Sequence, residues 1–197
     1  MTPLKALKGA VTALERAGCA YCLAGGHAAS LYRIQERVTR DVDFAIVVKP
    51  PASARAVAEA VISDMGLTPV VGYIPAGPKK PRRKAISLVT SKPEQGQSKG
   101  IIDLLLPVLP WIEQAVERAQ HNRIDLGFSR VPVITPEDLI IAKCYALRNS
   151  PDRFQDLDDL KEIFSNLKDL DSDYLQSELS KHELEIPEVI RKYASVL

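Results

Sequence analysis

The chain has 197 residues, of which 46% are hydrophobic and 26% are charged, as in an ordinary globular protein. A formal net charge of +1 excludes the strongly basic proteins that coat nucleic acid, so any contact with nucleic acid has to be local. Neither a transmembrane-length apolar run nor a signal-peptide pattern begins the sequence, and three cysteines without framework spacing suit a reducing compartment. We therefore expect a soluble, cytoplasmic protein with no membrane partner.

Helices and strands alternate in the first part of the predicted fold. Helices are predicted where apolar residues recur every three or four positions, and strands where β-branched residues cluster. The predicted elements are a helix over 4–16, a strand over 21–24, a helix over 27–33, a strand over 42–48 and a helix over 53–64. Gly25-Gly26 forms the turn between the first strand and the second helix.

Three further strands are predicted over 68–73, 85–90 and 100–106, with polar loops between them. No helix intervenes to make parallel crossovers, so we expect an antiparallel or mixed sheet. A helix over 109–120 and a short strand over 131–134 complete this part.

Helical patterns dominate from Thr135 onward, where an N-cap, a first-turn proline and two acids follow one another. The predicted helices cover 139–148, 151–167, 172–180 and 187–195. The fold class is therefore α/β (α+β), with a mixed β-sheet core and flanking helices in residues 1–134 and a C-terminal helical subdomain in residues 135–197.

Three aspartates are candidates for a metal site. Asp41 and Asp43 lie two residues apart on a predicted strand, so alternation places both carboxylates on one face. Asp103 lies among apolar residues on another predicted strand, where a charge is costly unless a metal or a partner compensates it. If the two strands are neighbours, the carboxylates form one site for Mg²⁺, suited to phosphoryl or nucleotidyl transfer.

An alternative is that Asp41 is an edge residue paired with Arg37 or Arg40 and only Asp43 faces inward. The Gly-Gly turn favours the metal site, because glycines allow a ligand to approach closely and the next helix offers its N-terminal N–H groups to phosphate. Steric needs alone can also explain a glycine pair. The combination of this turn with Asp-x-Asp in one short segment is what favours a triphosphate substrate.

Several segments resemble one family. Gly-Gly-His-Ala-Ala-Ser-Leu-Tyr at 25–32 and Arg-Val-Thr-Arg-Asp-Val-Asp-Phe at 37–44 resemble the first two motifs of the nucleotidyltransferase superfamily related to polymerase β. Asp103 matches the third acidic motif. The segments 133–148 and 153–160 resemble the helical motifs of the AbiEii-type branch, known mostly as toxins of toxin–antitoxin pairs.

The resemblance implies an enzyme that transfers a nucleoside monophosphate from a nucleoside triphosphate, with Mg²⁺ or Mn²⁺, to tRNA or protein, and that has a cognate antitoxin. The implied metal ligands are Asp41, Asp43 and Asp103, the implied nucleotide-binding residues are Gly25, Gly26, His27 and Lys143, and the implied acceptor-activating residue is Asp156. Two positions depart from the family. His27 replaces a frequent Ser or Thr, and Gln155 replaces a frequent Lys or Arg, which puts substrate choice and rate in doubt.

A cluster of basic residues precedes Asp103 in the sequence. It consists of Lys79, Lys80, Arg82, Arg83 and Lys84. It either forms a cationic lip for tRNA beside the acidic site or is a solvated loop. Without the family resemblance, Lys143 is as readily explained as a surface partner of Glu137 or Asp138. The remaining alternatives are an antibiotic nucleotidyltransferase of the aminoglycoside type and a non-catalytic nucleotide-binding interaction protein.

Overall fold

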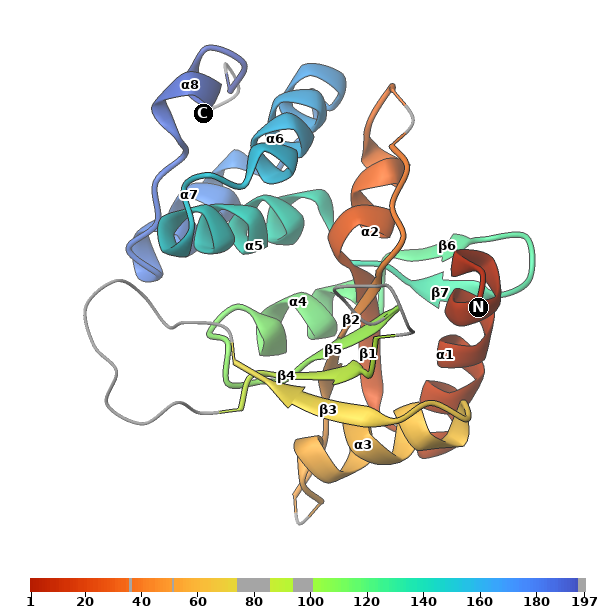
Figure 1. The fold of residues 1–197 in the computed structure, drawn as a ribbon. Helices are drawn as coiled ribbons and strands as arrows, with labels where there is room; N and C mark the ends of the chain where they lie inside the picture. Colours follow the sequence, from red (N-terminus) through yellow and green to blue (C-terminus); the bar gives the residue numbers. More distant parts are fainter. Residues whose placement is uncertain (36, 51, 74–85, 94–100, 195–197) are drawn as a thin grey trace.

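The computed structural model describes residues 1–35, 37–50, 52–73, 86–93 and 101–194. At its centre is a five-stranded mixed sheet with the strand order β1-β2-β5-β4-β3 (Figure 1). The strands of this sheet are β1 (Ala20–Ala24), β2 (Val42–Val47), β3 (Pro69–Gly72), β4 (Leu88–Ser91) and β5 (Ile102–Leu105). The helices are α1 (Pro3–Ala17), α2 (Gly25–Tyr32), α3 (Ala54–Asp64), α4 (Ile112–Ala119), α5 (Pro136–Asn149), α6 (Phe154–Asn166), α7 (Ser172–Lys181) and α8 (Glu188–Arg191). The predicted α/β class with a mixed sheet is confirmed.

Among the described strands of this sheet, β2 and β5 pair in parallel, whereas the other neighbours are antiparallel. β2 lies between β1 and β5, and its residues Phe44, Ala45 and Ile46 are fully buried, as the apolar and β-branched sequence of a central strand requires. The register places Asp43 opposite Asp103. Two aspartates far apart in the sequence thus become neighbours on one side of the sheet.

Helices cover the sheet and extend beyond it. α4 packs against β1 and β2, α1 packs against α3, and α2 contacts both the sheet and α6 (Figure 1). α5 packs against α6 and α7. Within the described residues, no helix is both long enough and apolar enough to cross a membrane.

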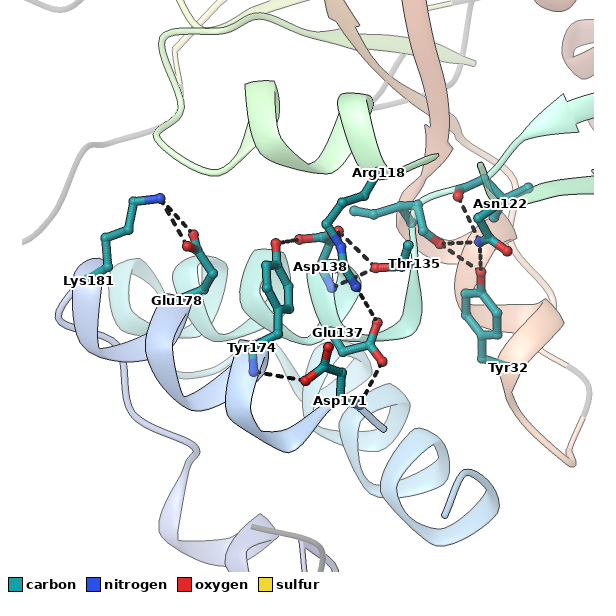
Figure 2. Close-up of polar contacts among 12 residues, drawn as sticks. Tyr32, Arg118, Asn122, Thr135, Glu137, Asp138, Asp171, Tyr174, Glu178 and Lys181 are labelled. Carbon is teal, nitrogen blue, oxygen red and sulfur yellow. Dashed lines mark hydrogen bonds and ion pairs between the residues drawn. The ribbon is translucent and has the colours of Figure 1, made fainter. Parts of the chain in front are cut away.

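The start of α5 is held by a buried polar cluster (Figure 2). Arg118 donates to Asp138 at 3.0 Å and to Glu137 at 3.2 Å, and it stacks on the ring of Tyr174 at 3.7 Å. The Tyr174 hydroxyl donates to Asp138 at 2.6 Å, and the side chain of Thr135 caps the helix by accepting from the N–H of Asp138. These contacts join α4, α5 and α7, and they occupy the two acids that were alternative partners for Lys143.

Some boundaries differ from the predicted ones. α2 begins at Gly25, two residues before the predicted start, and α8 is a single turn that ends at Arg191, short of the predicted 195. The strand β6 (Arg123–Asp125) was not predicted; it forms a hairpin with β7 (Arg130–Pro132). Each hairpin strand has three residues, too few for an alternating pattern to stand out. The division into residues 1–134 and 135–197 stays a prediction.

Candidate active site

One cleft of about 610 Å³ brings together the predicted site residues except His27, which is not among the residues that line it. It lies where the sheet meets α5, and its walls come from the Gly-Gly turn, β2, β4, β5, α5 and the start of α6. The predicted residues that line it are Gly25, Gly26, Asp41, Asp43, Asp103, Lys143 and Asp156. A cleft of this size is ordinary for a site that binds a ligand of nucleotide size.

Asp43 and Asp103 are register partners on the parallel strands β2 and β5, and both face the cleft. Thr90, on β4, donates its hydroxyl to the Asp103 carboxylate at 2.5 Å. Burial and, after it, the charges of Asp103 and Asp41 raise the pKa of Asp43 to about 7, although part of Asp43 stays accessible from the cleft. The carboxylates therefore repel one another and would be stabilised by a cation.

Asp41 lies one residue before β2 and not on the strand itself, which corrects the prediction that both aspartates are strand residues. Within the described ranges, no three or more His, Cys, Asp or Glu side chains are grouped closely enough to hold a metal ion. The donor set still fits a hard divalent cation, because it consists of carboxylates whose mutual repulsion already raises the pKa of Asp43. Asp41, Asp43 and Asp103 are the residues that would hold Mg²⁺ or Mn²⁺.

The two glycines of the turn make room for the protein's own side chains. Gly25 has a φ of +58°, and a Cβ built on it would lie 1.9 Å from Oδ2 of Asp43. A Cβ on Gly26 would lie 2.6 Å from Oγ1 of Thr39 and 3.3 Å from Cζ of Arg37. The turn is therefore packed against the Asp-x-Asp carboxylate on one side and the Arg-x-Thr segment on the other.

His27 lies in the first turn of α2, and its Nε2 is buried without a hydrogen-bond partner among the described residues. Burial lowers its pKa, the charge of Arg37 lowers it further, and Asp41 acts in the opposite direction. The imidazole is therefore neutral near pH 7. Its contact with a phosphate stays a prediction.

Lys143 is buried on α5 and makes two ion pairs with α6. Its Nζ lies 2.9 Å from Oδ1 of Asp156 and 2.6 Å from Oδ2 of Asp159. The surface pairing with Glu137 or Asp138, the alternative drawn from the sequence, is therefore wrong. Lys143 is positioned by these two carboxylates at the wall of the cleft.

Asp159 is fully buried and was not singled out from the sequence. It accepts from Arg33 at 2.5 Å and also pairs with Arg37, in addition to Lys143. Arg37 donates its second N–H group to the side chain of Gln155 at 3.0 Å. Arg37 therefore pairs with Asp159, not with Asp41 as the edge alternative assumed. The signal was present in the sequence, since positions 156 and 159 are three apart and share one face of a helix.

Asp156 also pairs with Arg153, so it receives a cation from each side. Burial alone would raise the pKa of Asp156, but Lys143 and Arg153 together outweigh it and lower that pKa below the ordinary value. A carboxylate with a lowered pKa is a weak base. This geometry suits orientation of a substrate better than removal of a proton.

The basic cluster at 79–84 lies outside the described residues, and its role as a lip of the cleft stays a prediction. The three cysteines are free thiols. Burial raises the pKa of the Cys22 thiol well above its usual range, so this residue is an inert part of the core.

The family model for the nucleotidyl transferase AbiEii toxin of type IV toxin–antitoxin systems matches residues 10–192. No protein of curated function matches the chain. The antibiotic-resistance factor ANT(2'')-Ia, solved in solution, is 15% identical with a TM-score of 0.53, over 90% of this chain and 89% of that one. An antigenic nucleotidyltransferase-like protein from Paracoccidioides brasiliensis is 18% identical with a TM-score of 0.49, over 90% and 86% of the two chains. The likeness to ANT(2'')-Ia shows a shared fold alone.

Proposed function

Since the chain belongs to the AbiEii family of nucleotidyltransferase toxins, we propose that it moves a nucleoside monophosphate from a nucleoside triphosphate to tRNA or protein. The observation that carries this proposal is the register of β2 and β5, which puts Asp43 beside Asp103 in the cleft that also contains Gly25, Gly26 and Lys143. Acidic residues for a metal and a glycine turn with a lysine for phosphates are the parts that this chemistry needs.

The phosphates of the donor would lie between the Gly-Gly turn and Lys143. The backbone N–H of Gly26 interacts with the Asp43 carboxylate and lowers its pKa, which partly offsets the effect of burial. A divalent cation held by Asp41, Asp43 and Asp103 would neutralise the phosphates and polarise the bond that breaks. Lys143 supplies a positive charge at the opposite wall, held there by Asp156 and Asp159.

Asp156 would orient the acceptor hydroxyl. It faces the cleft with a carboxylate fixed by Lys143 and Arg153, so a hydroxyl that hydrogen-bonds to it has a defined direction toward the donor. Because the pKa of Asp156 is lowered, this carboxylate is a weak base, and another group would have to remove the proton of the acceptor hydroxyl. Alanine at this position is expected to reduce transfer more than it weakens nucleotide binding.

A polynucleotide or protein acceptor is favoured over an aminoglycoside by the charges of the cleft. The acidic residues among those described as lining it are Asp41, Asp43, Asp103 and Asp156. The first three are the proposed metal ligands, and Asp156 is paired with Lys143 and Arg153. A polycationic antibiotic would need further carboxylates in the cleft.

The experiment incubates purified protein with Mg²⁺ and each labelled nucleoside triphosphate, first with total tRNA and then with cellular protein. The control is Asp43→Ala. Label that moves to RNA or protein with the wild type alone supports the proposal and identifies the donor. Transfer that persists in Asp43→Ala would refute the site, and transfer to an aminoglycoside alone would establish the antibiotic alternative.

A cationic lip for tRNA is the further part of this proposal. If the basic cluster at 79–84 contacts RNA, neutralising all five of its cations will weaken RNA binding and reduce its dependence on salt. Salt-dependent binding that survives the neutralisation will show that RNA is held elsewhere. Membership of this toxin family also supports the proposal of a cognate antitoxin, which would be tested by searching for a protein whose co-expression relieves growth inhibition by this chain.

A further inference from the structure

Polar and apolar residues both line the cleft. The carboxylates and the Gly-Gly turn supply the polar part, and apolar side chains from the sheet, from the segment before α4 and from α5 supply another part. The apolar residues of that part include Leu105, Leu109, Leu139 and Ala146. An apolar wall suits a flat aromatic ring and does not suit a triphosphate.

Two polar side chains that line the cleft lack partners within the described residues. Both amide atoms of Asn149 are shielded from solvent without a hydrogen bond, and so is the indole N–H of Trp111, a residue with 6% of its surface exposed. The two other asparagines of the chain, the half-buried Asn122 and the exposed Asn166, differ from Asn149 in having partners. Asn122 donates to the Tyr32 hydroxyl and to the carbonyl of Val133, and Asn166 donates to the carbonyl of Tyr32 (Figure 2 shows Asn122).

An unpaired buried amide costs free energy, so its presence in a cleft calls for a ligand that satisfies it. A carboxamide presents a donor beside an acceptor, which matches the paired donor and acceptor on the edge of a nucleobase. A nucleobase also has the flat apolar faces that the leucine-lined wall would contact. These properties distinguish a base from a sugar or a phosphate.

The position of Asn149 on α5 sets its distance from the phosphates. Lys143 and Asn149 both line the cleft, and six residues of α-helix correspond to a rise of about 9 Å. The ribose and base of a nucleotide span such a length when its phosphates lie near Lys143. We propose that the apolar part of the cleft binds the base of the donor nucleotide, with Asn149 reading its edge and Trp111 donating to a ring or carbonyl acceptor.

This inference rests on the proposed function and names the residues that select the donor. The test measures binding of ATP, GTP, CTP and UTP, each as a non-hydrolysable analogue with Mg²⁺, and of inorganic tripolyphosphate. The proteins are the wild type, Asn149→Ala, Asn149→Asp and Trp111→Phe. Asn149→Ala is expected to weaken the preferred nucleotide about tenfold or more and to leave tripolyphosphate binding unchanged.

Asn149→Asp replaces the amide donor by an acceptor of the same shape, so it is expected to change the order of preference among the four nucleotides. The unfolding midpoint of Asn149→Ala without nucleotide should be no lower than that of the wild type, because no hydrogen bond is lost and an unpaired buried amide is removed. Asn166→Ala serves as the matched control: it loses a bond to Tyr32 and is expected to lower the midpoint while keeping the nucleotide preference.

Three outcomes would overturn the inference. The first is an unchanged nucleotide preference in both Asn149→Ala and Trp111→Phe. The second is an equal loss of tripolyphosphate and nucleotide binding in Asn149→Ala, which would place this residue at the phosphates. The third is a variant of Asn149 or Trp111 that keeps the wild-type preference for the donor nucleotide but changes the preference for the terminal base of an RNA acceptor. That result would assign these residues to the acceptor. A wild type that binds neither nucleotide nor tripolyphosphate would refute the proposed function as well, so the two failures can be told apart.

Discussion

At residue 25, the left-handed backbone and the contact with Asp43 both require glycine. Gly18 has a similar positive φ of +64° but has nothing within 4 Å of a built Cβ. Gly18→Ala is therefore expected to cost only the backbone strain, about 1 kcal/mol of the free energy of unfolding. Gly25→Ala adds a clash with the Asp43 carboxylate.

We expect Gly25→Ala to lose more stability than Gly18→Ala and to abolish nucleotidyl transfer, since the carboxylate has to move. Denaturant unfolding and the labelled-nucleotide assay measure the two effects. Equal losses of stability in the two variants would contradict the close contact. Full activity in Gly25→Ala would show that the carboxylate can move without harm.

The pKa of Asp43 makes a prediction for the metal-free protein. The native pKa is about 7 and the ordinary value is 3.8, so between these pH values the native state holds a proton that the unfolded state has released. The free energy of unfolding therefore falls as the pH rises from about 4 to about 7. Asp43→Asn stays neutral, so it should lack this fall and be more stable than the wild type at pH 8.

The measurement is urea unfolding in EDTA at a series of pH values, and the quantity compared is the difference between the two proteins. Adding Mg²⁺ at pH 8 should stabilise the wild type more than Asp43→Asn. If the difference in the free energy of unfolding between the wild type and Asp43→Asn does not change between pH 4 and 8, the Asp43 carboxylate is not buried against like charges.

At the scale of elements, Asp159 joins three parts of the chain. Its carboxylate on α6 pairs with Lys143 on α5, with Arg33 at the end of α2 and with Arg37 in the segment that packs on the Gly-Gly turn. Removing one partner of a buried ion pair leaves uncompensated charge and costs about 3–5 kcal/mol. We therefore expect Asp159→Ala to be strongly destabilised.

The matched control for Asp159→Ala is the neighbouring Asp158→Ala. Asp158 also pairs with Arg33, at 2.7 Å, but its side chain is 53% exposed. An exposed pair contributes at most about 1 kcal/mol. Chemical denaturation of both variants compares them directly. A similar small loss in both would mean that α2, α5 and α6 are held together by apolar packing alone.

Prediction from the sequence succeeded for the helices and strands that have strong local patterns. It failed for some of the contacts that depend on the tertiary fold. β2 and β5 were predicted from their β-branched and apolar residues, and the capped start of α5 from Thr135 and Pro136. The hypothesis that Asp43 and Asp103 are neighbours needed a strand order that no local pattern encodes, and the structure confirms it. The role of Arg33 was missed because its contact with Asp159 joins α2 to α6 through space, whereas the helical spacing of Asp156 and Asp159 was visible in the sequence.

At the scale of the whole molecule, contacts cross the predicted boundary at residue 134. The side chain of Asn166 donates to the carbonyl of Tyr32 at 3.0 Å, and Arg118 donates to Asp138 at 3.0 Å. Asp159 adds its buried ion pairs to Arg33 and Arg37. We expect the chain to unfold in a single cooperative transition, with equal calorimetric and van't Hoff enthalpies.

Scanning calorimetry tests this expectation, and tryptophan fluorescence provides a second probe. Trp111 lies at the start of α4, within the first part of the chain, whereas helical circular dichroism also reports α5, α6 and α7. Coincident transitions support one cooperative unit. Two separate transitions would establish independent domains at residues 1–134 and 135–197.

The register of β2 and β5 has a consequence for synthesis on the ribosome. Asp43 leaves the ribosome early, but its neighbour Asp103 follows much later, and Lys143 and Asp156 come after that. A nascent chain that has not yet exposed these residues therefore has no complete cleft. The cleft is therefore assembled only after α6 has been synthesised and has packed against α5.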